Sequence, residues 1–321
     1  MSGLRPAFLI FVSSLALGLA VGAWAAEAKP LSRKQIVDLV QGSVSPRRII
    51  SLIEQRGISF EPSEEDLQAL KQAKASKEVL DAVRSARQIL PKEVLLARHR
   101  AKAKELESRG AAAEAESEYR AALALDSGDA ALHAGLAGAL GQQKKWDGAA
   151  AAYRRALEVK PKDFENTYQL GVALEQSGDQ TGAINTWADA AKIKEDDPRP
   201  FEQLARVLTE RRDWRRAAIA YRGLARLRPD SVKAYLGLGL ALRNGGHVNG
   251  AIEAYRVAVR LNPDDPVAHN NLGFSLEEKG DLPAALEQYR IAAQLNPSDS
   301  SIKTNLERVS LKLKRPSLVK K

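Results

Sequence analysis

Apolar and small residues recur along the chain with a period of 34 residues. In residues 270–297 a Leu-Gly pair at 272–273 is followed by Ala285, Tyr289 and Pro297, and residues 238–263 show the same residue types at the same spacing. In this frame six units follow one another without an insertion, at 96–129, 130–163, 164–197, 198–231, 232–265 and 266–299. Because a period of 20 to 50 residues is typical of stacked repeats, the pattern predicts a solenoid.

Each unit predicts two short helices. Positions 4, 7, 8 and 11 of a unit fall on one face of a helix with 3.6 residues per turn. Gly or Ala at position 8 and Ala at position 20 remove bulk where two helices approach, and an aromatic residue at position 24 fills the space to the next unit. Gly-Asp at positions 15 and 16, as at 178–179, is expected to end the first helix, and Pro at position 32 follows the second. Position 20 is alanine in all six units, namely Ala115, Ala149, Ala183, Ala217, Ala251 and Ala285.

The pattern resembles the tetratricopeptide repeat, which has a large residue at position 4, Leu-Gly at 7 and 8, Ala at 20, an aromatic at 24, Ala at 27 and Pro at 32. The resemblance covers residues 96–299. It implies an all-α fold, a right-handed superhelical α-solenoid of six repeats, whose first helices line a concave groove for a protein or an extended peptide. The first unit departs from the pattern with Lys102 at position 7 and Ser127 at position 32, as expected of a terminal repeat.

Positions 2, 5, 9, 12 and 13 of each unit point into the groove in this family. Tyr168 and Phe274 are aromatic at such positions, where packing between repeats does not require it, so we expect them to be exposed and to dominate binding. The family's chaperone-tail receptors grip a terminal carboxylate with Lys, Asn and Arg at set positions of three consecutive units, and no three units here match. The residues expected to contact a partner are Arg100, Lys104, Tyr168, Glu202, Arg206, Lys233, Arg243, Asn270 and Phe274.

Residues 1–25 have the pattern of a signal peptide. One arginine precedes an apolar stretch over 7–23, and Ala23-Trp24-Ala25 supplies a cleavage site. We expect cleavage after Ala25 and export of the mature chain to the periplasm or outside the cell. The alternative is an uncleaved segment that anchors the chain in the membrane through residues 7–23.

Residues 26–90 predict a small helical domain ahead of the repeats. Ser32 with Gln35 forms a capping box, Ser45 precedes a proline at a helix start, Gly57 ends that helix, and Ser63 and Ser76 are candidate N-caps. The segment resembles a small helical module found ahead of other domains in exported bacterial proteins, for which no function follows. A helix-turn-helix DNA reader is an alternative that export disfavours, so nucleic acid is not an expected partner.

Basic charge concentrates after the repeats and on the fourth unit. The formal net charge is +9, which favours anionic partners through long-range attraction. Residues 300–314 predict a cap helix, and 315–321 form a basic tail. Together with that tail, Arg215, Arg222 and Arg226, on one face of a predicted second helix, are the candidate contacts for an anionic partner.

Nothing in the sequence specifies catalysis, a metal or a cofactor. The chain has no cysteine, and no nucleophile–base set or phosphate-binding loop is apparent. His99, His133 and His269 share position 4 of different units, too far apart to hold one ion; we expect them to replace the usual large packing residue. We therefore expect a non-catalytic scaffold for protein interaction, with a role in cell-envelope assembly. The alternatives are a membrane-anchored accessory subunit and an enzyme with a site in residues 31–90.

Overall fold

The computed structural model describes residues 29–314, in which seventeen α-helices and no β-strand are found. The expected signal peptide and basic tail lie outside the described residues. The chain divides into two units, Met1–Ala101 and Lys102–Lys321, and the division falls within helix α6 (Lys92–Ser108). The predicted all-α superhelical repeat fold is confirmed.

Four helices build the described part of the N-terminal unit around one apolar core. They are α2 (Arg33–Gln41), α3 (Pro46–Arg56), α4 (Glu64–Gln72) and α5 (Lys77–Ser85). Ile58 forms isolated parallel bridges with Leu31 on one side and Gln88 on the other. Leu31 exchanges backbone hydrogen bonds with Gly57 and Ser59, and Ile58 does so with Arg87 and Ile89. Ser32 and Ser63 cap their helices in capping boxes, whereas Ser45 and Ser76 occupy the N-cap position without a side-chain hydrogen bond.

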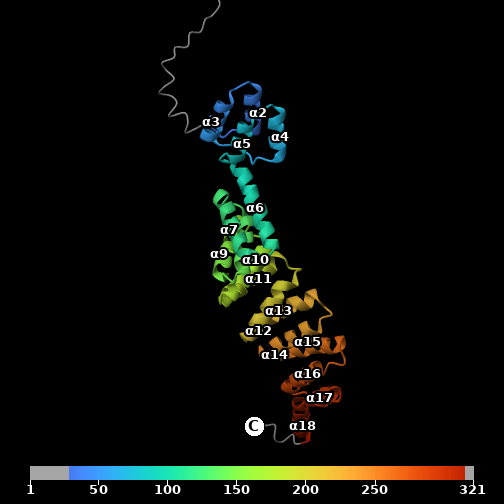
Figure 1. The fold of residues 1–321 in the computed structure, drawn as a ribbon. Helices are drawn as coiled ribbons and strands as arrows, with labels where there is room; N and C mark the ends of the chain where they lie inside the picture. Colours follow the sequence, from blue (N-terminus) through green and yellow to red (C-terminus); the bar gives the residue numbers. More distant parts are fainter. Residues whose placement is uncertain (1–28, 315–321) are drawn as a thin grey trace, which may run out of the picture. The chain divides into compact units, whose positions relative to one another are not determined.

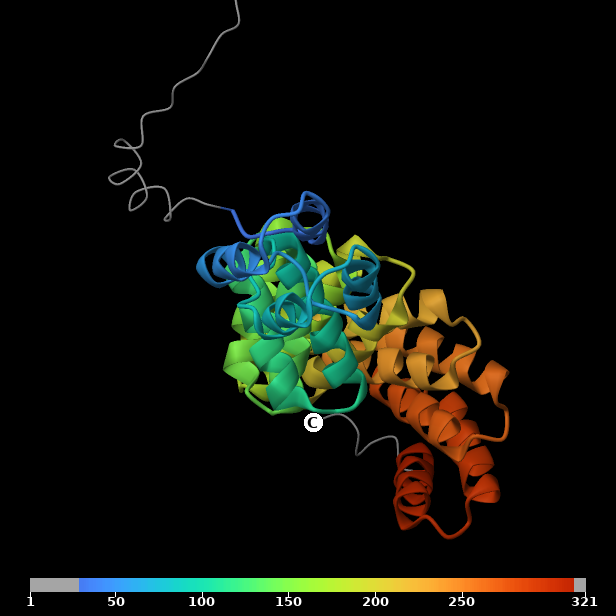
Figure 2. The same ribbon diagram turned by 45° about the horizontal axis from the view of Figure 1, so that its top comes forward.

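Twelve helices, α6 to α17, follow in the repeats, paired as the period predicts, and the cap helix α18 comes after them. The first helix of unit one is α6, which begins at Lys92 instead of residue 96. From α7 to α18 each helix packs against its sequence neighbours, and this stack can be followed in Figure 1 and, turned, in Figure 2. The remaining helices are α7 (Ala112–Leu125), α8 (Ala130–Gln142), α9 (Trp146–Val159), α10 (Phe164–Gln176), α11 (Gln180–Ile193), α12 (Pro198–Glu210), α13 (Trp214–Leu227), α14 (Val232–Asn244), α15 (Val248–Leu261), α16 (Pro266–Lys279), α17 (Leu282–Leu295) and α18 (Ser300–Lys314).

Close packing behind the first helices depends on residue size at position 8. All six alanines at position 20 are buried. Units three, five and six have glycine at position 8, and their aromatic residues Trp187, Tyr255 and Tyr289 are fully buried. A Cβ added at Gly239 would lie 2.5 Å from the Tyr255 ring, so the glycine makes room for the ring.

Alanine at position 8 gives a different result in units two and four. Their aromatic residues, Tyr153 and Tyr221, are only partly buried. Unit one also has alanine there, but Tyr119 is buried and donates a hydrogen bond of 2.8 Å to Glu107. The ring of Tyr221 still lies against the next unit, since a Cβ added at Gly237 would clash with it, but Tyr153 and Tyr221 also line hollows at the surface.

Both helices of a unit begin and end at fixed positions. Position 15 has a positive φ in all six units, and it is glycine in four of them. The exceptions are Lys144 (φ 59°) and Arg212 (φ 57°). Position 34 is the N-cap of the next first helix, and its side chain accepts backbone hydrogen bonds in every unit, at Asp129, Asp163, Asp197, Ser231, Asp265 and Asp299.

Histidine at position 4 does more than fill space. Nε2 of His133 lies 2.9 Å from the carbonyl oxygen of Ser127, and Nε2 of His269 lies 2.9 Å from that of Pro263. Both oxygens belong to position 32 of the preceding unit. These two histidines therefore connect a first helix to the turn before it.

Candidate functional site

The candidate site is the groove face, defined as positions 2, 5, 9, 12 and 13 of the first helices. Residues of this face contribute to the lining of three hollows in the C-terminal unit. The N-terminal hollow, about 500 Å³, lies at α8, α9 and α10; the middle hollow, about 600 Å³, at α12, α13 and α14; and the C-terminal hollow, about 550 Å³, at α14, α16 and α18.

Small residues open the N-terminal hollow. Ala134, Gly138 and Gly141 occupy positions 5, 9 and 12 of unit two, and Trp146 and Tyr153 line the same space. Burial, with the negative charges of Glu165 and Glu107 nearby, raises the pKa of Tyr153 to about 12, so this phenol stays protonated and can donate a hydrogen bond at neutral pH. The hollow therefore combines an apolar floor with a phenol.

Tyr168 is not the exposed aromatic that the sequence predicts. It is half-buried and stacks on Phe164 with ring centroids 6.3 Å apart. The guanidinium of Arg199 covers both rings, at 4.9 Å from Tyr168 and 5.0 Å from Phe164. Arg199 also pairs with Asp197 and Glu165. Its hydrogen bonds hold the pKa of Asp197 at about 2, which keeps this cluster ionised and Tyr168 covered.

Most of the charged side chains that line the middle hollow form ion pairs within the chain. Glu202 accepts a hydrogen bond of 2.6 Å from Arg228. Arg206 pairs with Glu175 and Glu210, and these carboxylates raise the pKa of its guanidinium. The expectation that Arg206 is available to a ligand carboxylate is therefore wrong. Lys233, also a lining residue, is exposed and has no acidic partner among residues 29–314.

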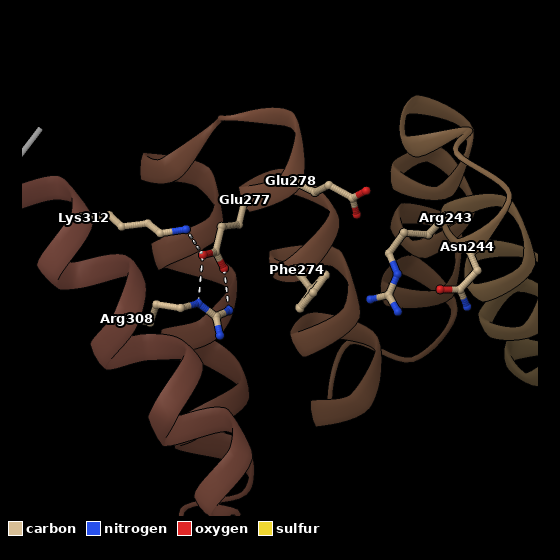
Figure 3. A pocket seen from close by; sticks show the side chains of 7 residues that line it. All are labelled: Arg243, Asn244, Phe274, Glu277, Glu278, Arg308 and Lys312. Atoms are coloured by element: carbon tan, nitrogen blue, oxygen red, sulfur yellow. Dashed lines mark hydrogen bonds and ion pairs between the residues drawn. The ribbon is translucent and has the colours of Figure 1, made fainter. Parts of the chain in front are cut away.

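Arg243 and Phe274 form the centre of the C-terminal hollow (Figure 3). The Arg243 guanidinium lies 4.4 Å from the Phe274 ring centroid, and 37 % of Phe274 is exposed. Arg243 has no ion pair within the described part of the chain. Phe274 thus fulfils the prediction of an exposed aromatic, and its neighbour is an arginine held in place by stacking instead of by a carboxylate.

Glu277 fastens the cap helix to this hollow. Arg308 donates to both of its carboxylate oxygens at 3.0 and 2.7 Å, and Lys312 and Tyr289 each donate at 3.0 Å (Figure 3). Burial alone would raise the pKa of Glu277, but these hydrogen bonds hold it at about 2. Asn270 also contacts the cap helix, since its Oδ1 accepts a hydrogen bond of 3.0 Å from Asn305.

Sequence reasoning missed the contribution of the cap helix. Extending the 34-residue frame into α18 places Arg308 at position 9 and Lys312 at position 13, so the period itself contained the signal. Within the C-terminal unit, Lys104, Tyr168 and Asn270 line none of the three hollows. Arg100 belongs to the N-terminal unit.

A second charged surface lies on α13. Arg215, Arg222 and Arg226 are exposed, as predicted, and Ile219, which is 62 % exposed, lies between them on the same helix face. Arg226 donates to the carbonyl oxygen of Glu195, whereas Arg215 and Arg222 have no partner among the described residues. This arginine stripe is independent of the groove face.

Two kinds of feature are absent from residues 29–314. No group of three or more histidine and acidic side chains is arranged there to hold a metal ion. No helix in this part of the chain has the length and apolar content to cross a membrane. Two glycine-rich strings of the sequence, at 135–141 and 237–239, lie inside α8 and α14 and not in a loop between a strand and a helix, as a phosphate-binding loop requires.

The fold and the groove face define a helical repeat solenoid. The chain belongs to the tetratricopeptide repeat family: one family model of that description matches residues 100–164, 135–200 and 203–266, and a second matches 254–287. No curated protein sequence matches the chain.

Solved structures share the architecture at low identity. MamA from Desulfovibrio magneticus RS-1, residues 41 to the end, is 24 % identical over 53 % of this chain and 97 % of that one, with a TM-score of 0.41. YrrB, a TPR protein with an unusual peptide-binding site, is 20 % identical over 59 % and 97 %, with a TM-score of 0.48. The Naa15/Naa10 complex bound to HypK-THB matches at 15 % identity over 68 % of this chain and 34 % of that one, with a TM-score of 0.58, a likeness of fold.

Proposed function

We propose that this protein is a non-catalytic scaffold whose groove face binds a peptide segment or a protein partner. The observation that carries the proposal is the pair formed by Phe274 and Arg243 in the C-terminal hollow. An exposed aromatic ring beneath an arginine without an acidic partner offers apolar contact area and hydrogen-bond donors at one point, and such residues are frequent hot spots. Family membership supports the same class of function.

Site-specific photo-crosslinking tests which surface is used. A benzophenone amino acid replaces Phe274 in one variant of the full chain and Ile219, on the arginine stripe, in a matched variant. We expect partner crosslinks from position 274. Crosslinks from position 219 alone would place binding on the arginine stripe and contradict the proposal. For a partner captured from position 274, Phe274→Ala should weaken binding by about 2 kcal/mol or more.

Tyr168 is the less suitable test residue. Its ring is covered by Arg199 and stacked on Phe164, so Tyr168→Ala also disturbs an existing cluster. We propose that the arginine stripe adds long-range attraction for anionic partners. Replacing Arg215, Arg222 and Arg226 with Glu should then lower the association rate and its salt dependence more than it changes the dissociation rate.

We further propose that the protein acts outside the cytoplasm, in assembly of the cell envelope. The support is the sequence pattern of residues 1–25. N-terminal sequencing of the protein from cell fractions tests it: a mature chain beginning near Ala26 outside the cytoplasm is expected. Full-length protein in the membrane fraction would favour the anchored accessory subunit, and full-length protein free in the cytosol would contradict both.

A further inference from the structure

In two of the hollows, one lining cation has no acidic partner among the described residues. Both of these cations lie on the same helix. The middle hollow is lined by three basic side chains (Arg206, Arg228 and Lys233) and two acidic ones, and so is the C-terminal hollow (Arg243, Arg308 and Lys312). In each hollow two of the cations are held in ion pairs within the chain. The third is Lys233 in one hollow and Arg243 in the other, and both lie on α14.

Apolar side chains lie between these two cations. Lys233, Leu236, Leu240 and Arg243 occupy positions 2, 5, 9 and 12 of unit five, within one face of a helix of 3.6 residues per turn. Leu236 and Leu240 are partly exposed. On the neighbouring α16, Phe274 is 37 % exposed and Val267 is 53 % exposed. The surface therefore has an apolar middle and a cation at each end.

The Arg243 guanidinium is positioned for a carboxylate. It lies 4.4 Å from the Phe274 ring centroid, and its N–H groups form no ion pair among the described residues, so they can pair with a carboxylate in a bidentate manner. Glu278 is exposed in the same hollow and forms no ion pair with Arg243 (Figure 3). A ligand carboxylate would therefore not need to displace an internal partner, as it would at Arg206 or Arg308.

We propose that α14 and α16 bind an acidic segment of a protein partner, in which two carboxylates flank apolar side chains. Lys233 and Arg243 are ten residues apart, about 15 Å along a helix that rises 1.5 Å per residue. An extended chain at about 3.3 Å per residue covers that length in four or five residues. The ligand motif is thus an acidic residue, three or four residues rich in apolar side chains, and a second acidic residue. This inference rests on the proposed groove-binding function.

Selection from random dodecapeptides displayed on phage tests the motif on the full chain. The parent protein should enrich peptides with two acidic residues four or five apart and apolar residues between them. The double variant Lys233→Glu/Arg243→Glu should instead enrich peptides with Lys or Arg at those two places. A gain of the opposite preference cannot come from misfolding. Arg222→Glu, which reverses a cation on the arginine stripe, should leave the parent preference unchanged.

Fluorescence anisotropy with the best synthetic peptide measures the effect. Arg243→Ala should weaken it about tenfold, and so should replacing its acidic residues with the amides. If the parent selects peptides without paired acids and Phe274→Ala still abolishes their binding, the motif is wrong while groove binding stands. If the parent selects no peptide above background, groove binding of peptides and the motif both fail. An unchanged preference in the double variant would also overturn the motif.

Discussion

Position 15 of every unit has a positive φ. Substitutions there can measure the free energy of this backbone conformation without a contribution from side-chain contacts. At Gly110, Gly178, Gly246 and Gly280 an added Cβ would meet nothing within 4 Å. The left-handed conformation costs a residue other than glycine about 1–2 kcal/mol. Part of this is offset because a non-glycine residue loses less backbone entropy on folding, by about 0.4–1 kcal/mol.

At position 15 the array allows both a substitution to glycine and a substitution of glycine by another residue. Lys144→Gly and Arg212→Gly should each stabilise the protein by about 0.5–1 kcal/mol, because both side chains are exposed and neither forms an ion pair among the described residues. Gly178→Ala should destabilise it by a similar amount. Gly128→Ala is the matched control, since Gly128 lies in a turn without positive φ and a Cβ there meets its nearest atom at 3.7 Å.

Thermal unfolding followed by circular dichroism at 222 nm measures these effects. For an array of this size 1 kcal/mol corresponds to a shift of about 2–4 °C in Tm. Because repeat arrays depart from two-state unfolding, hydrogen exchange of the altered unit should be measured as well, and it should change locally. A lower Tm for Lys144→Gly, or no change for Gly178→Ala, would refute the assignment of the cost to backbone conformation.

Three further substitutions test the packing, the helix caps and the charge network. Ala251→Phe should overpack a fully buried contact and cost about 1–3 kcal/mol in urea unfolding; an unchanged midpoint would mean that the repeat frame is misplaced. Asp265→Ala removes an N-cap that accepts two backbone hydrogen bonds and should cost about 1 kcal/mol, whereas Asp265→Asn should cost less. Glu277→Gln should cost about 1–3 kcal/mol at pH 7. Because the folded pKa of Glu277 is about 2 against an ordinary 4.5, its contribution is full above about pH 5 and is lost as the pH falls toward 2. The difference between Glu277→Gln and the parent should therefore shrink in melts at pH 3, and a constant difference would contradict the ionic role.

The period predicted the fold well because every unit buries the same positions. Ala251 and its five equivalents, and the helix pairs around them, follow from spacing and side-chain size alone. The linear pattern therefore predicts which face of each helix is buried in the array. The N-cap at position 34, an aspartate or serine ahead of each first helix, was not predicted.

The sequence does not predict which groove side chains are available to a ligand, because that depends on partners distant in sequence. Arg206 and Arg243 are both arginines on the groove face, yet Glu175, 31 residues earlier, pairs with Arg206, whereas Arg243 lies against the Phe274 ring and has no ion pair among residues 29–314. Tyr168 is covered because Arg199, from the next unit, reaches its ring. Which charges cancel is decided by rotamers and ion-pair geometry, and a spacing rule does not specify either.

The choice between glycine and alanine at position 8 has a consequence for how the ligand surface changes. Where the residue is alanine, as at Ala137 and Ala205, the tyrosine of the same unit is only partly buried and lines a hollow. Where it is glycine, as at Gly239, the ring of Tyr255 fills the interior. Unit one departs from this rule, because Tyr119 is buried although Ala103 occupies position 8. In the other five units a methyl group beneath the surface accompanies a ring that lines a hollow, so the contour of the groove can diverge between related arrays through residues that no ligand touches.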